Sequence, residues 1–154
     1  KIKITLKVGH IMAKIVSINI SDRKGVIKTP INEAKLKVDY GIVGDAHAGN
    51  WHRQISLLSK ESIDKMKSKG FNELKFGDFA ENITTEGIDV YKLPVGQRLQ
   101  IGECEVEVTQ IGKKCHGGCE IKKKTGDCVM PREGIFVKVI KEGIIYPNDE
   151  IKVL

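Results

Sequence analysis

The sequence predicts a mainly β domain: a closed or nearly closed β-barrel of about eight short strands with one or a few short helices. Short segments that alternate apolar and polar residues recur along the 154 residues, and glycine- and proline-containing turns separate them. Only one stretch has a clear helical pattern, whereas a parallel sheet with crossover helices would need several. With 40% hydrophobic residues, the chain is long enough to bury one core.

The elements can be assigned in order from these patterns. KIVSINI predicts a strand at 14–20, SDRKG a hairpin turn, and Pro30 an edge position for the strand that follows. Further strands are expected at 34–38, ISLLS, LPVGQRLQIG, CEVEVTQI, GIFVKVIKEG and 144–154, and residues 2–8 also alternate. The helix is expected in SKESIDKMKSKG, with Ser59 as N-cap and Gly70 beyond its end.

Residues 1–11 read as a leader outside the native protein, because MAKIVSINIS resembles a natural start, and 12–154 then form a single domain. No run of about 18 apolar residues and no secretory signal occurs, so we expect a cytoplasmic protein with no membrane partner. The net charge of +6 falls to +3 without the three lysines of the leader, and aromatic residues make up only 5%. This composition favours a small anionic ligand and argues against nucleic acid.

The stretch 108–133 is the strongest candidate for a site. It contains three of the four cysteines, His116 and six basic residues among four glycines. In a reducing compartment such thiols are ligands or nucleophiles rather than disulfides. Zinc could use Cys115, His116, Cys119 and Cys128, although the spacing lacks paired C-x-x-C hooks. Alternatively, neighbouring lysines would favour a thiolate that performs sulfur chemistry or binds a soft or high-valent metal, and would neutralise a phosphate.

A second candidate is the glycine-containing loop within 40–59, which carries Asp45, His47, His52 and Arg53. These residues suggest a loop that faces a ligand, and the alternative is a surface loop whose polar groups cap nearby backbone. Glu81 and Glu86 could form an acid–base pair, but two acids five positions apart in a turn-rich segment are more often a cap and a solvated charge. The alternation in 104–111 directs Cys104 into the core as a small hydrophobic residue.

Six blocks in order, VGDAHAG, ISLLS, GDFAENITTEGID, LPVGQRLQIG, VTQIGKKCHGGCEI and GDCVMPREGIF, together resemble the MOSC domain, the C-terminal domain of molybdenum cofactor sulfurases. The resemblance extends from about residue 13 to 154 and is to the stand-alone bacterial type. It implies a β-rich barrel that handles the molybdenum cofactor or its sulfur.

The resemblance also implies site residues. In reductase members a cysteine thiolate binds molybdenum, and Cys119 in HGGCEI is the matching position, with Cys115 as its rival for the catalytic thiol. No proline precedes Cys119, and the nearby Cys115 and Cys128 keep a persulfide relay open. Arg98 is a further arginine candidate for a phosphate. The cofactor-binding candidates are Arg53, Lys113, Lys114, Gly117, Gly118, Arg132, Asp45, His47, His52 and Asn82.

The function expected is binding of the molybdenum cofactor (molybdopterin), or carriage of its sulfur, in cofactor biosynthesis, sulfuration or delivery. One alternative is a small cofactor-dependent reductase of N-hydroxylated compounds, and another is a zinc-stabilised interaction domain, so enzymatic activity stays open. Expected partners are molybdenum cofactor biosynthesis proteins or a cysteine desulfurase, plus electron donor proteins for a reductase. Any pyridoxal phosphate is expected in such a partner and not in this chain.

Overall fold

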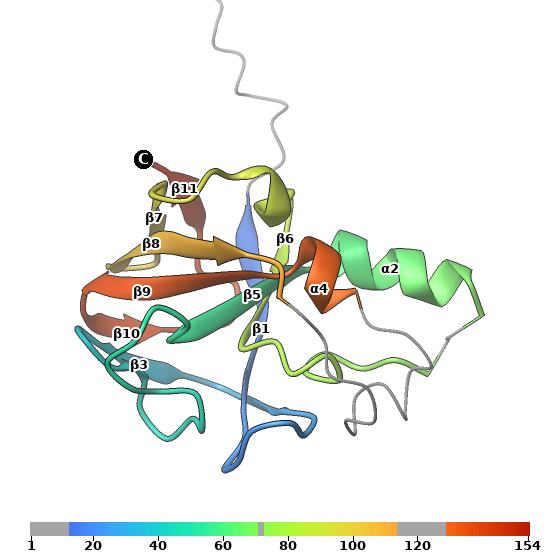
Figure 1. Cartoon of the computed structure of the whole chain (residues 1–154), viewed down its shortest axis with the longest axis horizontal. Coiled ribbons are helices and arrows are strands. Elements are labelled where there is room, and N and C mark those ends of the chain that lie inside the picture. Colours follow the sequence, from blue (N-terminus) through green and yellow to red (C-terminus); the bar gives the residue numbers. More distant parts are fainter. Residues whose placement is uncertain (1–12, 71–72, 114–128) are drawn as a thin grey trace, which may run out of the picture.

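Two β-sheets form most of the structure, a computed structural model that describes residues 13–70, 73–113 and 129–154 (Figure 1). The larger sheet has eight strands in the order β11 (Ile151–Val153), β7 (Arg98–Ile101), β8 (Cys104–Ile111), β9 (Ile135–Lys141), β5 (Ile55–Ser59), β6 (Ile83–Glu86), β1 (Lys14–Ile20) and β2 (Thr29–Ile31). The smaller sheet has the order β10 (Gly143–Ile145), β3 (Ala34–Lys37) and β4 (Gly41–Ile42). Among the described strands, β5 and β6 pair in parallel and the other pairs are antiparallel.

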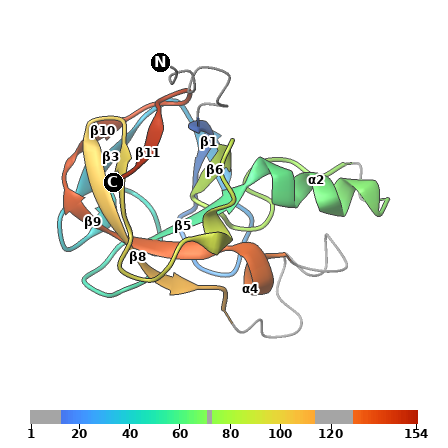
Figure 2. The same cartoon turned by 90° about the horizontal axis from the view of Figure 1, so that it is seen from above.

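The strands curve around a shared interior (Figure 2), but the predicted closure into a barrel is not confirmed. The order of the larger sheet has two ends, β11 and β2. The start of β1 does approach the segment before β11: Lys14 and Glu150 form an isolated bridge. The Ile15 amide donates to the Asp149 carbonyl at 2.9 Å, and the Ile151 amide to the Ala13 carbonyl at 2.8 Å. The mainly β prediction is therefore confirmed at the level of a large mixed sheet with few helices.

The main hydrophobic core follows the period-2 alternation of the strands. In β8 the residues Cys104, Val106 and Val108 are fully buried while their neighbours are partly exposed, as the sequence predicts. Strand β5 is buried along its whole length, since both of its sides are paired and both faces are covered. A second apolar cluster lies beneath helices α2 (Lys60–Ser68) and α4 (Met130–Glu133), outside the curved sheets.

Helix α2 confirms the helical prediction and links the parallel strands β5 and β6. The Ser59 hydroxyl accepts from the Ser62 amide at 3.1 Å and caps the first turn. Ile63 and Met66, three residues apart, bury the apolar face. Helix α4 and the 3-10 helix η1 (Val90–Lys92) are single turns. None of the helices in the described ranges is long and apolar enough to cross a membrane.

The predicted strand at 144–154 is wrong in one respect, because the structure divides it into β10 and β11. A turn separates them: the Asp149 amide donates to the Tyr146 carbonyl at 3.1 Å, and Asn148 has a φ of 76°. The break moves β10 into the smaller sheet, beside β3. The prediction of Pro30 at an edge is confirmed, since β2 ends the larger sheet. Residues 1–11, including the strand-like 2–8, lie outside the described residues.

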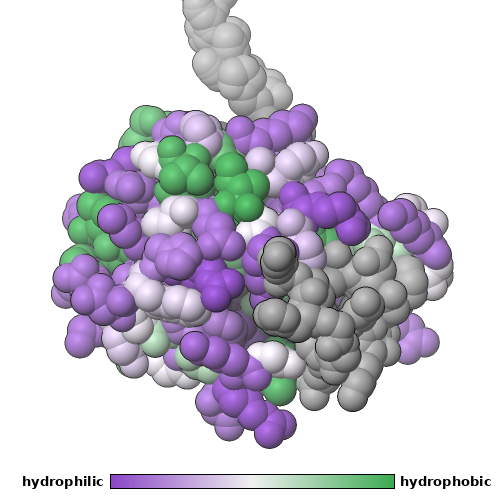
Figure 3. Space-filling model, in the orientation of Figure 1, coloured by the Kyte–Doolittle hydropathy of each residue, from purple (hydrophilic) through white to green (hydrophobic). Residues whose placement is uncertain are grey.

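The face shown in Figure 3 is mostly hydrophilic. Hydrophobic side chains form a small group at the top of this view. The exposed large hydrophobic residues of the described chain include Val95, Val153 and Leu154. Scattered exposed apolar residues of this kind are normal on a protein surface and do not indicate a site by themselves.

Candidate functional site

The cysteine-rich stretch connects β8 to β9, and its own residues 114–128 lie outside the described residues. These include Cys115, Cys119, Cys128, His116, Lys114, Gly117 and Gly118. The two ends of the connection are described and lie together. The Gly112 amide donates to the Gly134 carbonyl at 2.6 Å. Gly112 has a φ of +68°, and a Cβ there would lie 2.3 Å from the Pro131 carbonyl oxygen, so the close approach requires glycine.

The glycine-containing loop packs beside this end of β8. The Thr109 hydroxyl donates to the His52 carbonyl, and His52 Nε2 lies 2.9 Å from Gln110 Oε1. The side-chain amide of Gln110 in turn donates through Nε2 to the Gly112 carbonyl at 2.7 Å. The two segments singled out in the sequence thus approach each other at the described end of β8. The tip of the cysteine-rich segment lies outside the described residues.

Arg53 projects from this loop between two aromatic rings. Its guanidinium carbon lies 4.8 Å from the centre of the Trp51 ring and 5.6 Å from that of Phe136. The Arg53 Nε is buried and has no hydrogen-bond partner in the described part of the chain. Lys24 Nζ also lies over the Trp51 ring, at 4.7 Å. A buried donor without an acceptor is costly, and an acceptor on a ligand would satisfy it.

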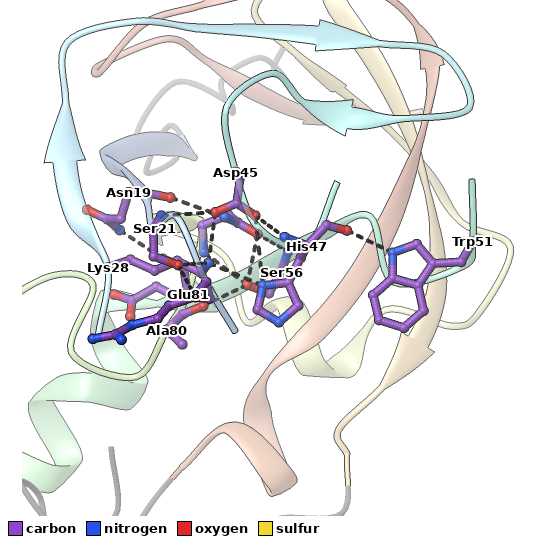
Figure 4. A network of polar contacts seen from close by, with 11 residues as sticks. Asn19, Ser21, Lys28, Asp45, His47, Trp51, Ser56, Ala80 and Glu81 are labelled. Atoms are coloured by element: carbon purple, nitrogen blue, oxygen red, sulfur yellow. Dashed lines mark hydrogen bonds and ion pairs between the residues drawn. The ribbon is translucent and has the colours of Figure 1, made fainter. Parts of the chain in front are cut away.

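A fully buried ion pair between Lys28 and Asp45 lies behind the loop (Figure 4). Lys28 Nζ is 2.8 Å from Asp45 Oδ1, and neither side chain is exposed. The amides of Ser21 and His47 donate to the same carboxylate at 3.1 and 3.0 Å. Burial opposes ionisation of Asp45, but these bonds and the Lys28 charge hold its pKa below the usual value. Burial lowers the pKa of Lys28, and Asp45 partly offsets that effect.

The backbone around Lys28 is fixed by the segment that precedes β6. The Lys28 amide donates to the Gly77 carbonyl at 2.8 Å. Gly77 has a φ of +93°, and a Cβ there would lie 2.2 Å from the Lys28 carbonyl oxygen. Glu81 organises this segment: its buried carboxyl accepts from the amides of Gly77 and Phe79 and from the Thr84 hydroxyl. Burial raises the pKa of Glu81.

His47 stands at the exposed side of the ion pair. Its side chain is 18% exposed, and its Nδ1 lies 3.2 Å from Lys28 Nζ. Burial and then the Lys28 charge lower the pKa of His47 to about 4, with Asp45 opposing and Lys113 and Lys24 adding to the shift. The imidazole is therefore neutral at pH 7. Lys113, the last residue described before 114–128, is thus close enough for its charge to lower this pKa.

The structure brings some of the predicted residues together and separates others. Asp45, His47, Arg53 and Lys113 share one region, with His52 beside β8. Asn82 is buried in the wall behind it, where its side chain accepts from the Ser56 amide at 3.0 Å and donates to the Asn19 carbonyl at 3.1 Å.

The two other arginine candidates lie in different places. Arg132 is exposed on α4, next to the contact between Gly112 and Pro131 at the end of β8. Arg98 lies on β7, where it forms ion pairs with Glu105 and Glu107 at 2.9 and 3.2 Å. Of the two proposed carboxylates, Glu81 binds backbone amides, as the capping interpretation has it.

Lys28 is the residue that sequence reasoning missed. It stands among the strand-like residues VIKTPI, where a lysine predicts a solvent-facing position. No pattern in the sequence links it to Asp45, 17 positions later. Within the described ranges, no group of three or more His, Cys, Asp or Glu residues could hold a metal ion.

Comparison with known proteins identifies the family. The MOSC domain family matches residues 44–152, more than two thirds of the chain. The chain belongs to the MOSC domain family. This MOSC domain is similar in structure to the YuaD protein (APC1665) from Bacillus subtilis, with a TM-score of 0.74 and 20% identity over 93% of this chain and 96% of that one.

Two further solved structures have a similar fold. YiiM from Geobacillus stearothermophilus matches with a TM-score of 0.71 and 20% identity, over 92% of this MOSC domain and 75% of that chain. YiiM from Escherichia coli matches with a TM-score of 0.69 and 16% identity, over 94% and 70%. No curated protein matches the sequence.

Proposed function

We propose that this MOSC domain binds the molybdenum cofactor and acts as a carrier in its biosynthesis, sulfuration or delivery. The observation that carries the proposal is the buried Arg53 Nε that lacks a partner among the described residues, beside a group of cations at the end of β8. Membership of the MOSC family supports the molybdenum cofactor as the ligand.

The charges of the described residues fit an anionic ligand. Arg53, Lys24 and Lys113 supply positive charge around Trp51 and His47. The nearby carboxylate of Asp45 does not cancel them, because Lys28 neutralises it inside the protein. The planar guanidinium of Arg53 matches the geometry of a phosphate, and the two flanking rings keep it from rotating freely.

The thiol of Cys119, or its rival Cys115, would complete this site from the connection between β8 and β9. When bound, the cofactor would supply a molybdenum centre that a thiolate can bind. As a sulfur carrier, the Cys119 thiolate would instead attack the persulfide of a cysteine desulfurase, take its terminal sulfur and release the donor's cysteine as a thiolate. Both roles need a thiolate, which the surrounding lysines favour.

Asp45 favours the carrier over the reductase. A reductase would need a substrate cavity lined by Asp45, His47 and His52, yet the Asp45 side chain has no exposure and is fully engaged by Lys28, Ser21 and His47. It cannot reach a substrate without breaking a buried ion pair. The expected partners are accordingly cofactor biosynthesis proteins or a cysteine desulfurase in the cytoplasm.

Metal analysis and titration test the proposal. Protein purified from a molybdate-fed host should contain molybdenum, and so should the Cys104→Ser control, whereas Cys119→Ser should lose it. Apo-protein should bind molybdopterin, and Arg53→Ala should weaken binding by roughly 5- to 100-fold, because a charge-assisted hydrogen bond of about 1–3 kcal/mol is lost. Stoichiometric zinc with no molybdenum and no binding of molybdopterin would assign the site to a structural metal instead.

A further inference from the structure

We infer that Lys28 fixes His47 as the neutral imidazole tautomer with its proton on Nε2, which makes His47 a dedicated hydrogen-bond donor to an oxyanion group of the ligand. The ligand half of this inference rests on the proposed function. The tautomer half rests only on atoms of this chain.

The described residues can accept every proton of the Lys28 ammonium group. An ammonium group has three protons and accepts none. Among the described residues, Lys28 Nζ has three neighbours within hydrogen-bond distance: Asp45 Oδ1 at 2.8 Å, Ser21 Oγ at 2.9 Å and His47 Nδ1 at 3.2 Å.

The first two neighbours can only accept from Lys28. Asp45 is a carboxylate that also accepts from the amides of Ser21 and His47. The Ser21 hydroxyl donates its own proton to the Arg23 carbonyl at 2.8 Å, so a lone pair of its oxygen faces Lys28. The third ammonium proton therefore points at His47 Nδ1, which must present a lone pair. The proton of the neutral ring then lies on Nε2.

The backbone of His47 is held on both sides, so the ring is placed before any ligand arrives. The His47 amide donates to Asp45 Oδ2 at 3.0 Å, and the His47 carbonyl accepts from Trp51 Nε1 at 2.8 Å (Figure 4). His47 Nε2 forms no hydrogen bond with a described residue, and the ring is partly exposed. Its N–H is thus available to an acceptor outside the described residues.

This arrangement limits what His47 can do. It cannot act as a base through Nδ1, because the Lys28 ammonium occupies that lone pair. It cannot bind a metal through Nε2 unless the proton moves to Nδ1, where it would face an ammonium. The charged groups that surround the ring are Lys28, Lys113 and Lys24, with Asp45 opposing them. Since Lys28 and Asp45 neutralise each other, the charges of Lys113 and Lys24 and the neutral N–H donor remain to attract an oxyanion, such as a phosphate group or molybdate.

Nitrogen NMR of the wild-type apo-protein tests the tautomer directly. The ¹⁵N shifts and two-bond couplings of the His47 ring at pH 7, assigned by their absence in His47→Gln, should show a protonated Nε2 and an unprotonated Nδ1. A ring protonated on Nδ1, or one that exchanges between tautomers, would overturn the inference. Since no ligand is involved, this failure would leave the molybdenum and molybdopterin tests of the proposed function untouched.

Titration with inorganic phosphate and, separately, inorganic molybdate tests the ligand half. Either anion should shift the Nε2 resonance of His47. His47→Gln extends an amide N–H toward the position of Nε2 and should keep the affinity within about threefold, whereas His47→Asn reaches only Nδ1 and should lose about tenfold or more. Lys60→Met, which removes an exposed charge on α2, is the control and should bind as the wild type does.

A response to phosphate alone would place the phosphate end of the ligand at His47, and a response to molybdate alone would place the metal-oxo end there. Binding of neither anion, or equal affinities in His47→Gln and His47→Asn, would overturn the donor role. If molybdopterin still bound in that case, the proposed function would stand and the inference alone would fail.

Discussion

Two lysine–aspartate pairs in this protein have nearly the same length and opposite environments. Lys28 and Asp45 are 2.8 Å apart with no exposure of either side chain, whereas Lys60 and Asp64 are 2.9 Å apart on α2 with exposures of 37% and 46%. We expect Lys28→Met to lower the free energy of unfolding by about 3–5 kcal/mol, because it leaves the Asp45 carboxylate buried without its counter-charge. Lys60→Met should lower it by only about 0.3–0.5 kcal/mol.

A double-mutant cycle separates the interaction between Lys28 and Asp45 from the cost of burying each charge alone. Asp45→Asn alone leaves the Lys28 ammonium unpaired, and Lys28→Met with Asp45→Asn removes both charges. The double variant should lose less stability than the sum of the two single losses, because it leaves no buried charge without its partner. For a chain of this size, about 3–5 kcal/mol corresponds to a fall in Tm of roughly 6–20 °C.

Urea unfolding monitored by circular dichroism at pH 7 measures these losses. The difference between wild type and Lys28→Met should narrow in acid. The folded pKa of Asp45 is lowered, so its contribution is present above the unfolded pKa and is lost as pH falls through the folded value, while the unpaired carboxyl of the variant takes up a proton more readily. Equal losses in the free energy of unfolding for Lys28→Met and Lys60→Met would refute the reasoning that burial makes the pair of Lys28 and Asp45 important for stability.

Three further predictions follow from other residues. The pKa of His47 is lowered to about 4, so the unfolded chain binds its proton first and stability should decrease as pH falls from about 6.5 to about 4; His47→Gln should remove that part of the slope in pH-dependent urea unfolding. Burial raises the pKa of the Cys104 thiol to about 11, so iodoacetamide at pH 8 should leave Cys104 unmodified in the folded protein and alkylate it in urea, as mass spectrometry of its peptide would show. Gly77→Ala should destabilise the fold by more than about 1 kcal/mol, because its φ is +93° and its Cβ would meet the Lys28 carbonyl, whereas Gly25→Ala, with open space around it, should cost less in the same assay.

Strands and the helix could be predicted where the local pattern and the tertiary environment agree. β8 alternates because one face of it packs on the core, and the cap at Ser59 is a local signal. The division of 144–154 into two strands was not predictable, since it depends on which sheet pairs with each half. The approach of β1 to the segment before β11 was not predictable either, because the two segments are far apart in the chain.

The candidate site was predictable only in part. Glycine spacing and polar residues identified the loop that carries Asp45 and His47, because such composition is unusual for a connection between strands. The burial of Lys28 could not be predicted, because a lysine is buried only where the fold supplies partners for its charge, and Asp45 is distant in the sequence. The sequence could not show that Asp45 is buried and engaged by Lys28 and the Ser21 amide, because both partners lie elsewhere in the chain.

Trp51 is the single tryptophan of the chain, and it contacts three residues of the candidate site region. Its indole N–H bonds the His47 carbonyl at 2.8 Å, while Lys24 and Arg53 lie over its ring at 4.7 and 4.8 Å. The emission of an indole depends on the electric field of nearby charges, and here two of those charges are the ones that an anion would attract. Tryptophan fluorescence therefore reports on this region alone, so binding of an anion here would be measurable in real time without any label.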